Sequence, residues 1–177
     1  MLHRCSAWRV LQTFFRQPTA KLSLAEISRQ AGLAHTSVMK HLEELRRAGL
    51  IAKEKTRQGT RTYPVFKADQ EAEAFRDLKR LDNLASLEKL TDYLVQHLLP
   101  ECVVLFGSYS RGEDVEDSDI DIYVQAKDKQ LDLKTFERQL SRKMHVIFSE
   151  KFSGYSKELQ NNIINGVVLH GYLEAVQ

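Results

Sequence analysis

The chain has 177 residues with a net charge of +2, and 42% of them are hydrophobic. This length holds one large domain or two small ones, and no segment approaches the ~18 apolar residues of a membrane-spanning helix. Arg4, Arg9 and Arg16 interrupt the apolar residues near the N-terminus, so no signal-peptide core is expected. The two cysteines, Cys5 and Cys102, have neither disulfide nor metal-ligand spacing. We therefore expect a cytoplasmic protein that does not partner a membrane.

Charge is distributed unevenly along the chain. Residues 1–68 hold 13 Lys and Arg against 4 Asp and Glu, a net charge of +9, whereas residues 69–177 hold 13 against 20, a net charge of −7. Such asymmetry indicates a basic module that seeks anionic partners, joined to an acidic one. We predict an α+β chain with a domain over residues 1–68, a helical linker over 69–99 and a second domain over 100–177.

The basic part begins with two predicted helices. Apolar residues recur at helical spacing from Ala7 to Phe15, and Pro18 lies beyond them as a stop. Ser23 and Glu26 have the spacing of a capping box, which predicts a second helix that runs to Ala31. Gly32 suits the left-handed position that follows a helix end.

A third helix and a hairpin complete this part. Val38, Leu42 and Leu45 form one apolar face, and Gly49 ends the helix. Residues 50–55 and 61–66 are predicted to pair as strands around a tip at residues 56–60. Two helices joined by a short turn with glycine form a helix-turn-helix. With the basic hairpin, the region resembles a winged-helix DNA-binding domain.

Polar and basic side chains outside this apolar face are the expected contacts to double-stranded DNA. Those of the third helix suit base edges and phosphates in the major groove, and those of the hairpin suit backbone phosphates. The alternative is that the domain binds only protein and that its lysines and arginines are merely solvated. The residues assigned to DNA are Thr36, Ser37, Lys40 and His41 on the helix, and Lys53, Lys55, Arg57 and Arg61 on the hairpin.

The linker is predicted to be one long helix or two. Seven leucines recur at spacings of three and four between Leu78 and Leu98. Such spacing serves a helix packed on its own domains, or a homodimer seam of coiled-coil type, and both remain open. Pro100 closes the helix before the second domain.

The second domain carries the most informative motif. The apolar run 103–106 is followed by Gly107 and Ser108, and a second run begins at Asp119-Ile120-Asp121. Alternate residues of a strand share a face, so Asp119 and Asp121 are expected to project together. Two adjacent carboxylates repel each other unless a cation neutralises them, and a Gly-Ser turn can offer N–H groups and a hydroxyl to phosphate.

Neighbouring acids leave another interpretation open. Glu113, Asp114, Glu116 and Asp117 precede the pair, and acidic runs are usually solvated loops. The complete constellation of strand, Gly-Ser turn, polar loop and Asp-x-Asp strand favours a metal-dependent nucleoside triphosphate site instead.

Residues 107–112 together with residues 118–121 resemble the signature of the minimal nucleotidyltransferases of the DNA polymerase β-like superfamily, over roughly residues 85–177. The resemblance implies a small α/β domain with a short mixed sheet. It implies that Gly107 and Ser108 hold the triphosphate, with Arg111 and Ser118 beside it, and that Asp119 and Asp121 bind Mg²⁺ or Mn²⁺. The implied reaction transfers a nucleoside monophosphate from an NTP, ATP being expected, to a hydroxyl.

The sequence departs from that family at one position. A third carboxylate is expected on a later strand, but the matching segment 143–148 has His145 there. Imidazole is a poorer ligand for Mg²⁺ than for Mn²⁺ or Zn²⁺, although it can act as a general base. Three explanations remain open: weakened catalysis, another metal, or a substitute carboxylate such as Asp132 or Glu150.

The remaining elements are predicted to be a helix over 128–142, a strand over 143–149 and a last helix over 157–173. Two functions follow. The first is a nucleotidyltransferase with a DNA-binding winged helix, which transfers to a protein hydroxyl or to another acceptor. The resemblance to antitoxins of this type implies a toxin partner as one such protein acceptor. The alternative is a transcriptional regulator whose degenerate transferase domain senses a nucleotide or a metal.

Overall fold

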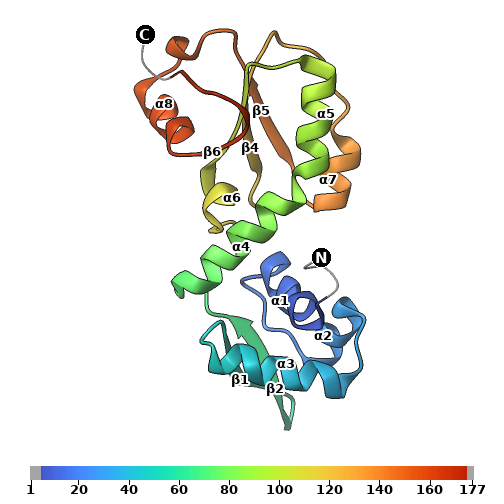
Figure 1. Cartoon of the computed structure of the whole chain (residues 1–177). Coiled ribbons are helices and arrows are strands. Elements are labelled where there is room, and N and C mark those ends of the chain that lie inside the picture. Colours follow the sequence, from blue (N-terminus) through green and yellow to red (C-terminus); the bar gives the residue numbers. More distant parts are fainter. Residues whose placement is uncertain (1–4, 175–177) are drawn as a thin grey trace. The chain divides into compact units, whose positions relative to one another are not determined.

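The computed structural model describes residues 5–174. The chain divides into two compact units, with the boundary between Lys79 and Arg80 inside helix α4 (Figure 1). Within residues 5–174, no helix is long and apolar enough to cross a membrane.

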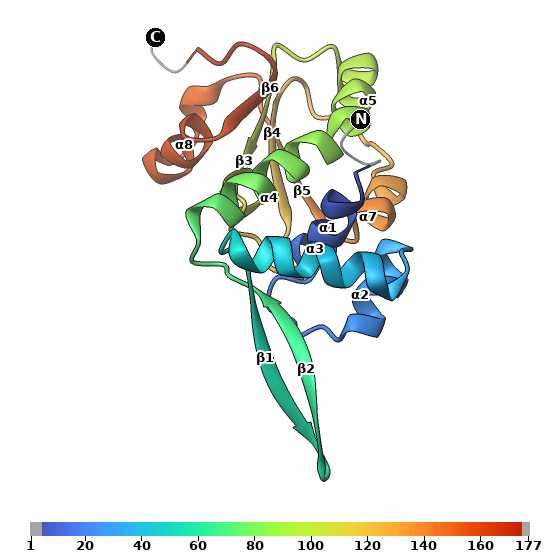
Figure 2. The same ribbon diagram turned by 60° about the horizontal axis from the view of Figure 1, so that its bottom comes forward.

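The N-terminal unit contains three helices and a long antiparallel hairpin. Figure 2 shows the hairpin projecting away from the helices, with its tip farthest from them. The elements are α1 (Ser6–Arg16), α2 (Leu24–Ala31), α3 (His35–Arg47), β1 (Ile51–Gln58) and β2 (Arg61–Ala68), and α4 (Glu73–Ser86) begins here. The helix-turn-helix and wing predicted from the sequence are therefore confirmed. The wing strands are longer than predicted, because β1 continues to Gln58 and the tip is residues 59–60, not 56–60.

Local capping signals fix the ends of α2. The Ser23 hydroxyl accepts a hydrogen bond from the Glu26 amide at 3.3 Å, and the Ser23 amide donates to the Glu26 carboxylate at 2.7 Å. The hydrogen bonds from Ser23 are the main reason that the pKa of Glu26 lies below its usual value. Gly32 then takes the left-handed conformation with φ of 62°. The predicted capping box and helix end are confirmed.

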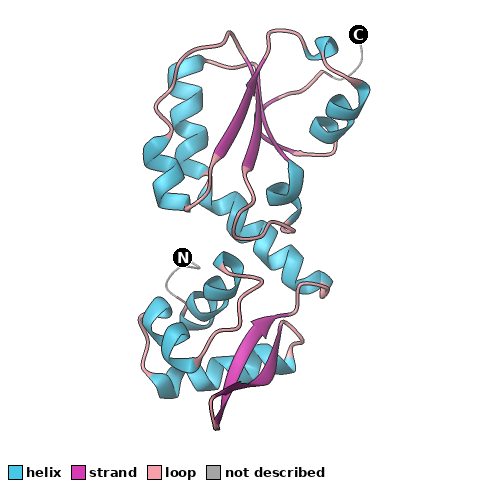
Figure 3. Cartoon of the chain, turned by 180° about the vertical axis from the view of Figure 1, so that it is seen from behind, coloured by secondary structure: helices cyan, strands magenta, loops and turns pink. Residues whose placement is uncertain are grey.

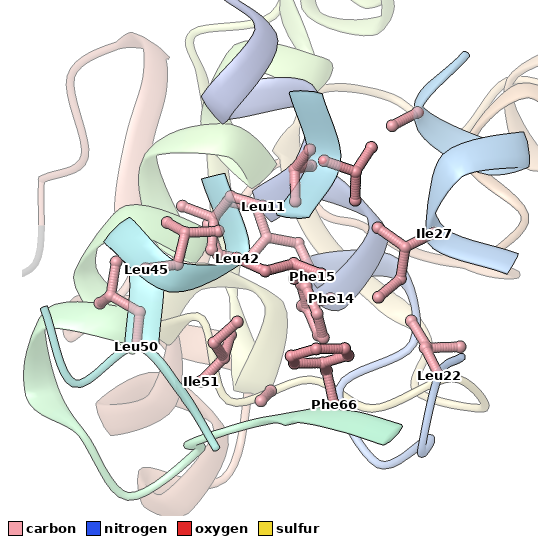
Figure 4. Packing of buried hydrophobic residues seen from close by; sticks show 14 of the residues in the cluster. Leu11, Phe14, Phe15, Leu22, Ile27, Leu42, Leu45, Leu50, Ile51 and Phe66 are labelled. Atoms are coloured by element: carbon pink, nitrogen blue, oxygen red, sulfur yellow. The ribbon is translucent and has the colours of Figure 1, made fainter. Parts of the chain in front are cut away.

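Apolar side chains from all three helices and the hairpin share one core, which Figure 4 shows at close range. Phe14 and Phe15 of α1 lie among Leu42 of α3 and Phe66 of β2, each at most 3% exposed. Full burial of one such side chain contributes roughly 1.5–3 kcal/mol. This core holds α3 in place and leaves its polar face outward.

A short β-bridge, which was not predicted from the sequence, pairs a third segment of chain with the hairpin. Leu22, just before α2, exchanges two backbone hydrogen bonds of 2.8 Å with Phe66 of β2. The base of the hairpin is therefore anchored to the segment between α1 and α2.

The linker forms two helices, α4 and α5 (Glu88–Leu98), which settles the choice left open by the sequence. Leu87, Leu90 and Leu94 are buried in the core of the C-terminal unit, whereas Leu78 packs on the N-terminal core. Leu81 is 57% exposed. Most of the leucine repeat thus packs within its own units.

The C-terminal unit is built on a four-stranded mixed sheet of order β5-β4-β3-β6, seen from behind in Figure 3. β3 is antiparallel to β4 and β6, and β4 is parallel to β5. The strands are β3 (Cys102–Phe106), β4 (Ile120–Gln125), β5 (Met144–Phe148) and β6 (Val167–Gly171). The short mixed sheet that the resemblance implied is confirmed.

Helices cover both faces of this sheet. The other elements are α6 (Gly107–Arg111), α7 (Lys134–Leu140), the 3₁₀ turn η2 (Phe152–Gly154) and α8 (Lys157–Ile164). α5 and α7 pack on the face that receives Ile120, Ile122 and Val124 of β4, and α8 with η2 packs on the face that receives Tyr123. Alternation along β4 therefore directs Asp121 to the α8 face, because residues two apart share a face.

Two element predictions for the C-terminal unit were wrong in their extent. The predicted last helix over 157–173 ends at Ile164, and residues 167–171 form β6 instead. Two adjacent valines fit a strand, and Gly166 allows the turn to lie so close to β3 that a side chain there would meet the Leu105 carbonyl. The predicted helix over 128–142 begins only at Lys134. The Lys134 amide donates a hydrogen bond of 3.1 Å to the Asp132 carboxylate.

Candidate functional site

The glycine-serine turn and the acidic strand meet at one end of the sheet, where β3 finishes and β4 starts. Phe106, the last residue of β3, pairs with Asp121 of β4, and Asp121 pairs in parallel register with His145 of β5. Gly107 and Ser108 begin α6 directly after β3. Three strands therefore bring Gly107, Asp121 and His145 together from distant parts of the sequence.

Gly107 touches the Asp121 carboxylate. Its φ is +72°, a left-handed conformation that side chains other than glycine adopt at a cost. A β-carbon at this position would overlap Asp121 Oδ2 and stand 3.2 Å from its Cγ. Backbone conformation and space therefore both require glycine here, so that the carboxylate lies directly against the start of α6.

Asp121 also contacts His145 on its other side. His145 Nδ1 lies 3.2 Å from Asp121 Oδ1. Because an ionised carboxylate only accepts hydrogen bonds, Nδ1 carries the hydrogen and donates it, and the neutral ring then has its lone pair on Nε2. The side chains of His145 and Asp121 are 62% and 28% exposed, so both can be reached from solvent.

Asp119 lies in the loop directly before β4 and is exposed. It lines a cavity of about 860 Å³, together with acidic residues of its own loop and basic residues at and after α7. The other lining residues are Glu116, Asp117, Ser118, Lys134, Glu137, Arg138, Ser141, Arg142 and Lys143. Within residues 5–174, no group of three His, Cys, Asp or Glu side chains is placed to hold a metal ion.

The two remaining predicted nucleotide contacts have partners within the domain. The Arg111 guanidinium bonds the Glu113 carboxylate at 2.6 Å. The Ser118 hydroxyl accepts a hydrogen bond of 2.9 Å from the Val115 amide. Both side chains therefore shape the loop between α6 and β4.

A buried polar cluster holds this loop, and the sequence did not reveal it. Asp114 is 2% exposed, and it is therefore not a solvated loop acid like its neighbours Glu113 and Asp117. Its carboxylate accepts a hydrogen bond of 2.8 Å from Asn83 and lies 3.7 Å from the Arg142 guanidinium. Asn83 also donates to the Tyr109 carbonyl at 2.9 Å. The cluster joins the C-terminal part of α4, α6, the loop and the segment before β5. All of these lie within the C-terminal unit.

The Tyr109 hydroxyl lies at the edge of this cluster. It is 3.1 Å from the Ser86 hydroxyl, and burial raises the pKa of Tyr109 to about 12. Tyr109 therefore stays protonated and serves packing. No local pattern marks any of these residues, because the contacts join segments more than 20 residues apart.

Of the two carboxylates considered as substitutes for a third acid, Glu150 lies away from the site and Asp132 is hydrogen-bonded to the backbone at the start of α7. Glu150 follows the far end of β5, five residues beyond His145, a distance of about 16 Å along an extended chain. It lines a different cavity with Gln125, at the opposite end of β4. The Asp132 carboxylate accepts a hydrogen bond from the amide of Lys134 at the start of α7.

On the N-terminal unit, the residues assigned to DNA differ in their availability. Thr36 and Lys40 of α3 are exposed and Ser37 is half-buried. His41 is not open in the same way, because its ring nitrogens lie 2.8 Å from the Ser6 hydroxyl and 2.9 Å from the Glu44 carboxylate.

The basic residues of the hairpin are exposed on both strands: Lys53, Lys55, Arg57 and Arg61. Lys53 lies over the Phe66 ring, 5.9 Å from its centroid, and the Arg57 guanidinium bonds the Gly59 carbonyl at 3.1 Å. These contacts orient two cations while their charge stays accessible.

Comparison with known families agrees with both halves of this architecture. Residues 88–172 match the family described as polymerase beta, nucleotidyltransferase, and residues 8–54 match a helix-turn-helix domain. The C-terminal part of the chain is therefore similar to nucleotidyltransferase domains of the polymerase β type, and the N-terminal part is similar to helix-turn-helix domains.

Solved structures give weaker likenesses. A possible transcriptional regulator from Methanosarcina mazei Go1 is 13% identical, with 54% of this chain and 81% of that chain covered and a TM-score of 0.37. A toxin-antitoxin crystal structure with AMP-PNP is 25% identical, with 51% and 74% covered and a TM-score of 0.37. Among curated proteins, none matches the chain at a significant level.

Proposed function

We propose that the C-terminal domain transfers a nucleoside monophosphate from an NTP to a hydroxyl acceptor. The observation that carries the proposal is the position of Asp121 at the start of β4, where it is held between Gly107 and His145 and where the preceding Asp119 is exposed. The match of residues 88–172 to nucleotidyltransferases supports nucleotidyl transfer as the reaction at this site.

In the proposed reaction, the acceptor oxygen attacks the α-phosphorus of the NTP. A new oxygen–phosphorus bond forms, the bond between the α-phosphorus and the bridging oxygen breaks, and pyrophosphate leaves. Gly107 and Ser108 are proposed to bind the triphosphate through backbone N–H groups and the hydroxyl. The acceptor proton passes to Asp121 or to the Nε2 lone pair of His145, both of which are reachable from solvent.

Asp119 and Asp121 are the proposed ligands of a divalent cation, since carboxylate oxygens suit Mg²⁺ and Mn²⁺. Such an ion would neutralise the triphosphate and stabilise the leaving pyrophosphate. His145 favours Mn²⁺, because imidazole is a better ligand for that ion than for Mg²⁺. ATP is the proposed nucleotide.

The test is incubation of the purified chain with each labelled NTP and either Mg²⁺ or Mn²⁺. Pyrophosphate release and label transfer that disappear in Asp119→Asn and Asp121→Asn support the proposal. Asp128→Asn is the matched control, because it removes a carboxylate from the opposite end of the sheet. Transfer that persists in both site variants would contradict the assignment.

One observation favours a second candidate. His145 contributes an imidazole, not a third carboxylate, beside Asp121. A site with two acids can bind a nucleotide and its metal without turnover, and the chain would then be a nucleotide-sensing regulator. Calorimetry that shows tight NTP binding by a preparation without pyrophosphate release would favour this candidate.

The N-terminal domain is proposed to bind double-stranded DNA. Its α3 presents Thr36 and Lys40 outward, and the exposed wing adds Lys55, Arg57 and Arg61. Residues 8–54 match a helix-turn-helix domain, a motif that places its second helix in the major groove. The excess positive charge of residues 1–68 suits the phosphate backbone.

A salt titration of binding to random duplex DNA tests this module. Each phosphate contact removed should reduce the slope of log K against log salt by about 0.9. Arg57→Gln and Lys55→Gln should each do so. Lys67→Gln is the control, because Glu54 holds the Lys67 ammonium at 2.6 Å. A flat salt response of the wild-type chain would contradict DNA binding.

A protein acceptor, such as a toxin partner, and a homodimer are further proposals for partners. Leu81 is exposed on α4 and is the leucine of the repeat most available to a second copy. Sedimentation of the wild-type chain and of Leu81→Glu would test the dimer. A dimer that persists unchanged in Leu81→Glu would contradict a seam at this position.

A further inference from the structure

The cavity that Asp119 lines lies wholly within the C-terminal unit, and its lining is divided by charge. Glu116, Asp117 and Asp119 line it from the loop before β4. The other side is formed by α7 and by the segment that joins α7 to β5. The volume of about 860 Å³ falls within the range of about 300–1,000 Å³ that is typical of small-molecule sites.

Three cations on the α7 side are exposed: Lys134 and Arg138 on the helix, and Lys143 directly before β5. Lys134 and Arg138 are four residues apart, so they lie on the same face of α7. The Arg138 Nε–H donates a hydrogen bond of 3.2 Å to the Lys134 carbonyl. Within residues 5–174, none of the three side chains forms an ion pair with a carboxylate. All three charges are therefore available to an anionic ligand.

The other charged groups on this side already have partners. The Glu137 carboxylate accepts a hydrogen bond of 3.0 Å from the Met144 amide. The Arg142 guanidinium lies 3.7 Å from the buried Asp114 carboxylate. The α7 side of the cavity therefore presents positive charge to a ligand, whereas the loop side presents negative charge.

The sheet places the positive side of the cavity next to the proposed NTP site. β4 lies between β3 and β5. Gly107 and Ser108 follow the end of β3, on one side of Asp121, whereas Lys143 precedes β5 on the other side. The Ile120 amide donates a hydrogen bond of 2.9 Å to the Lys143 carbonyl, so Lys143 lies beside the start of β4.

The geometry of phosphoryl transfer assigns the two sides of Asp121 to different groups. The attacking and leaving oxygens lie roughly in line, on opposite sides of the phosphorus. The triphosphate, which contains the leaving pyrophosphate, is proposed to bind Gly107 and Ser108 on the β3 side. The acceptor then approaches from the side of β5 and α7. The cations of α7 and Lys143 therefore meet the acceptor and not the leaving group.

We propose that this cavity is the acceptor subsite and that it selects a hydroxyl with a phosphate group nearby, as on a ribose phosphate. The inference rests on the proposed function of the C-terminal domain. The acceptor phosphate binds Lys134, Arg138 and Lys143 through charge-assisted hydrogen bonds. The acidic loop repels that phosphate, so the acceptor lies with its phosphate on α7 and its hydroxyl toward Asp119.

The transfer step keeps the chemistry proposed for the domain. The acceptor oxygen forms a bond to the α-phosphorus, the bond to the bridging oxygen breaks, and pyrophosphate leaves. The acceptor proton passes to Asp121 or to His145 Nε2. The product carries the nucleoside monophosphate in a phosphodiester bond. A protein hydroxyl without a neighbouring phosphate leaves the three cations unused.

The test compares AMP with adenosine, because the two acceptors share their ribose hydroxyls and differ only in the phosphate. The full chain is incubated with labelled ATP and Mn²⁺, and kcat and KM are measured for each acceptor. We expect kcat/KM for AMP to exceed that for adenosine by about tenfold, which is the effect of one charged hydrogen bond.

Lys143→Gln and Arg138→Gln should each raise the KM for AMP by about tenfold and leave the KM for adenosine and the Kd of ATP unchanged. Lys127→Gln is the matched control, because Lys127 is also exposed but lines the cavity at the opposite end of β4. Circular dichroism confirms that each variant is folded.

A second arm measures the subsite without turnover. The NTP site is filled with α,β-methylene-ATP, which cannot transfer its nucleotide, and AMP is titrated by calorimetry. AMP should bind this complex, and Lys143→Gln should weaken the binding by about tenfold. Equal AMP affinity in the wild type and Lys143→Gln would overturn the proposal.

A short single-stranded RNA distinguishes the two sources of a ribose phosphate. A KM at least tenfold lower for the RNA than for AMP, lost in Lys143→Gln, assigns the end of a nucleic-acid strand. An equal KM assigns a free nucleotide. Because the basic N-terminal unit is the same in the wild type and the variant, its own binding to RNA does not change the comparison.

Two results would overturn the acceptor subsite and leave the proposed function standing. One is transfer to AMP and adenosine with equal kcat/KM. The other is a loss of ATP affinity in Lys143→Gln as large as the loss of AMP affinity, which would place the cations on the triphosphate. Absence of transfer and of pyrophosphate release with every acceptor overturns both proposals.

Discussion

The carboxylate of Asp121 lies against the α-carbon of Gly107, where β3 passes into α6. A side chain at Gly107 would overlap Asp121 Oδ2. The contact joins the phosphate-binding turn of the proposed site to its acidic strand. A change that moves the two residues apart should therefore weaken NTP binding more than the accompanying loss of stability of the C-terminal unit explains.

Gly107→Ala tests this relationship. The left-handed φ of +72° alone should destabilise the C-terminal unit by about 1–2 kcal/mol. The added methyl should also displace Asp121, so NTP binding and transfer should fall well beyond what the lost stability explains. Thermal unfolding and NTP titration measure the two effects.

Gly49→Ala is the matched control for the backbone term. Gly49 has φ of +73° and nothing within 4 Å of an added β-carbon. It should therefore show the conformational cost without loss of NTP binding. Equal NTP affinity in Gly107→Ala and the wild type would contradict a functional role for the close approach.

His145→Asp examines the departure from a three-carboxylate site. A third oxygen ligand beside Asp121 suits Mg²⁺ better than imidazole does. We expect Mg²⁺-supported transfer to rise by about tenfold, which corresponds to about 1.4 kcal/mol in the barrier. The ratio of Mg²⁺ to Mn²⁺ activity, measured by pyrophosphate release, should rise as well.

His170→Asp adds the same carboxylate to β6, at the other edge of the sheet, and should leave the metal ratio unchanged. If His145→Asp lowers transfer with both metals, His145 is itself a productive group, and its Nε2 lone pair becomes the better assignment for the proton acceptor.

The elements that the sequence predicted well are those with local causes. The capping box of Ser23 and Glu26 and the left-handed Gly32 each act within a few residues, so α2 could be delimited without any knowledge of packing. Alternation in 120–124 likewise predicted that Ile120, Ile122 and Val124 share one buried face of β4, although it did not predict that Tyr123 is buried on the other face.

The failures have non-local causes. Val167 and Val168 fit a helical pattern as well as a strand, and only pairing with β3 decides between them. The burial of Asp114 depends on Asn83 and Arg142, each about 30 residues away, so its acidic neighbours suggested a solvated loop. His145 lies on the predicted strand, paired with Asp121. The roles of both residues remain predictions.

Asp114→Asn should destabilise the C-terminal unit strongly. The Asp114 side chain is 1% exposed and that of Arg142 is 8% exposed, so the substitution removes a buried charge partner of the guanidinium. Loss of one partner from a buried pair costs roughly 3 kcal/mol or more. Urea unfolding of the variant gives the difference.

Asp117→Asn removes an exposed carboxylate from the same loop and should change stability by no more than about 0.5 kcal/mol. A similar small effect from Asp114→Asn would show that the buried cluster is not what holds the loop. Reduced NTP binding in Asp114→Asn at a temperature where it is folded would show that the loop positions Asp119.

The ion pairs of Glu54 predict how the stability of the N-terminal unit depends on pH. Glu54 lies 2.8 Å from the Lys21 ammonium and 2.6 Å from that of Lys67. Hydrogen bonds from Lys21, and then from Lys67, lower the pKa of Glu54 from 4.5 to about 2. Because the folded pKa is depressed, the contribution of Glu54 is fully present above the unfolded value and is lost as the pH falls toward 2.

The measurement is the difference in Tm between wild type and Glu54→Gln across this range. The difference should be constant from neutral pH down to about pH 5, shrink below it and vanish near the folded pKa of about 2. Glu71→Gln, an exposed acid of the same unit, is the control and should show little difference at any pH. A Tm difference for Glu54→Gln that grows as the pH falls would contradict the ion pairs, because protonation of Glu54 can only weaken them.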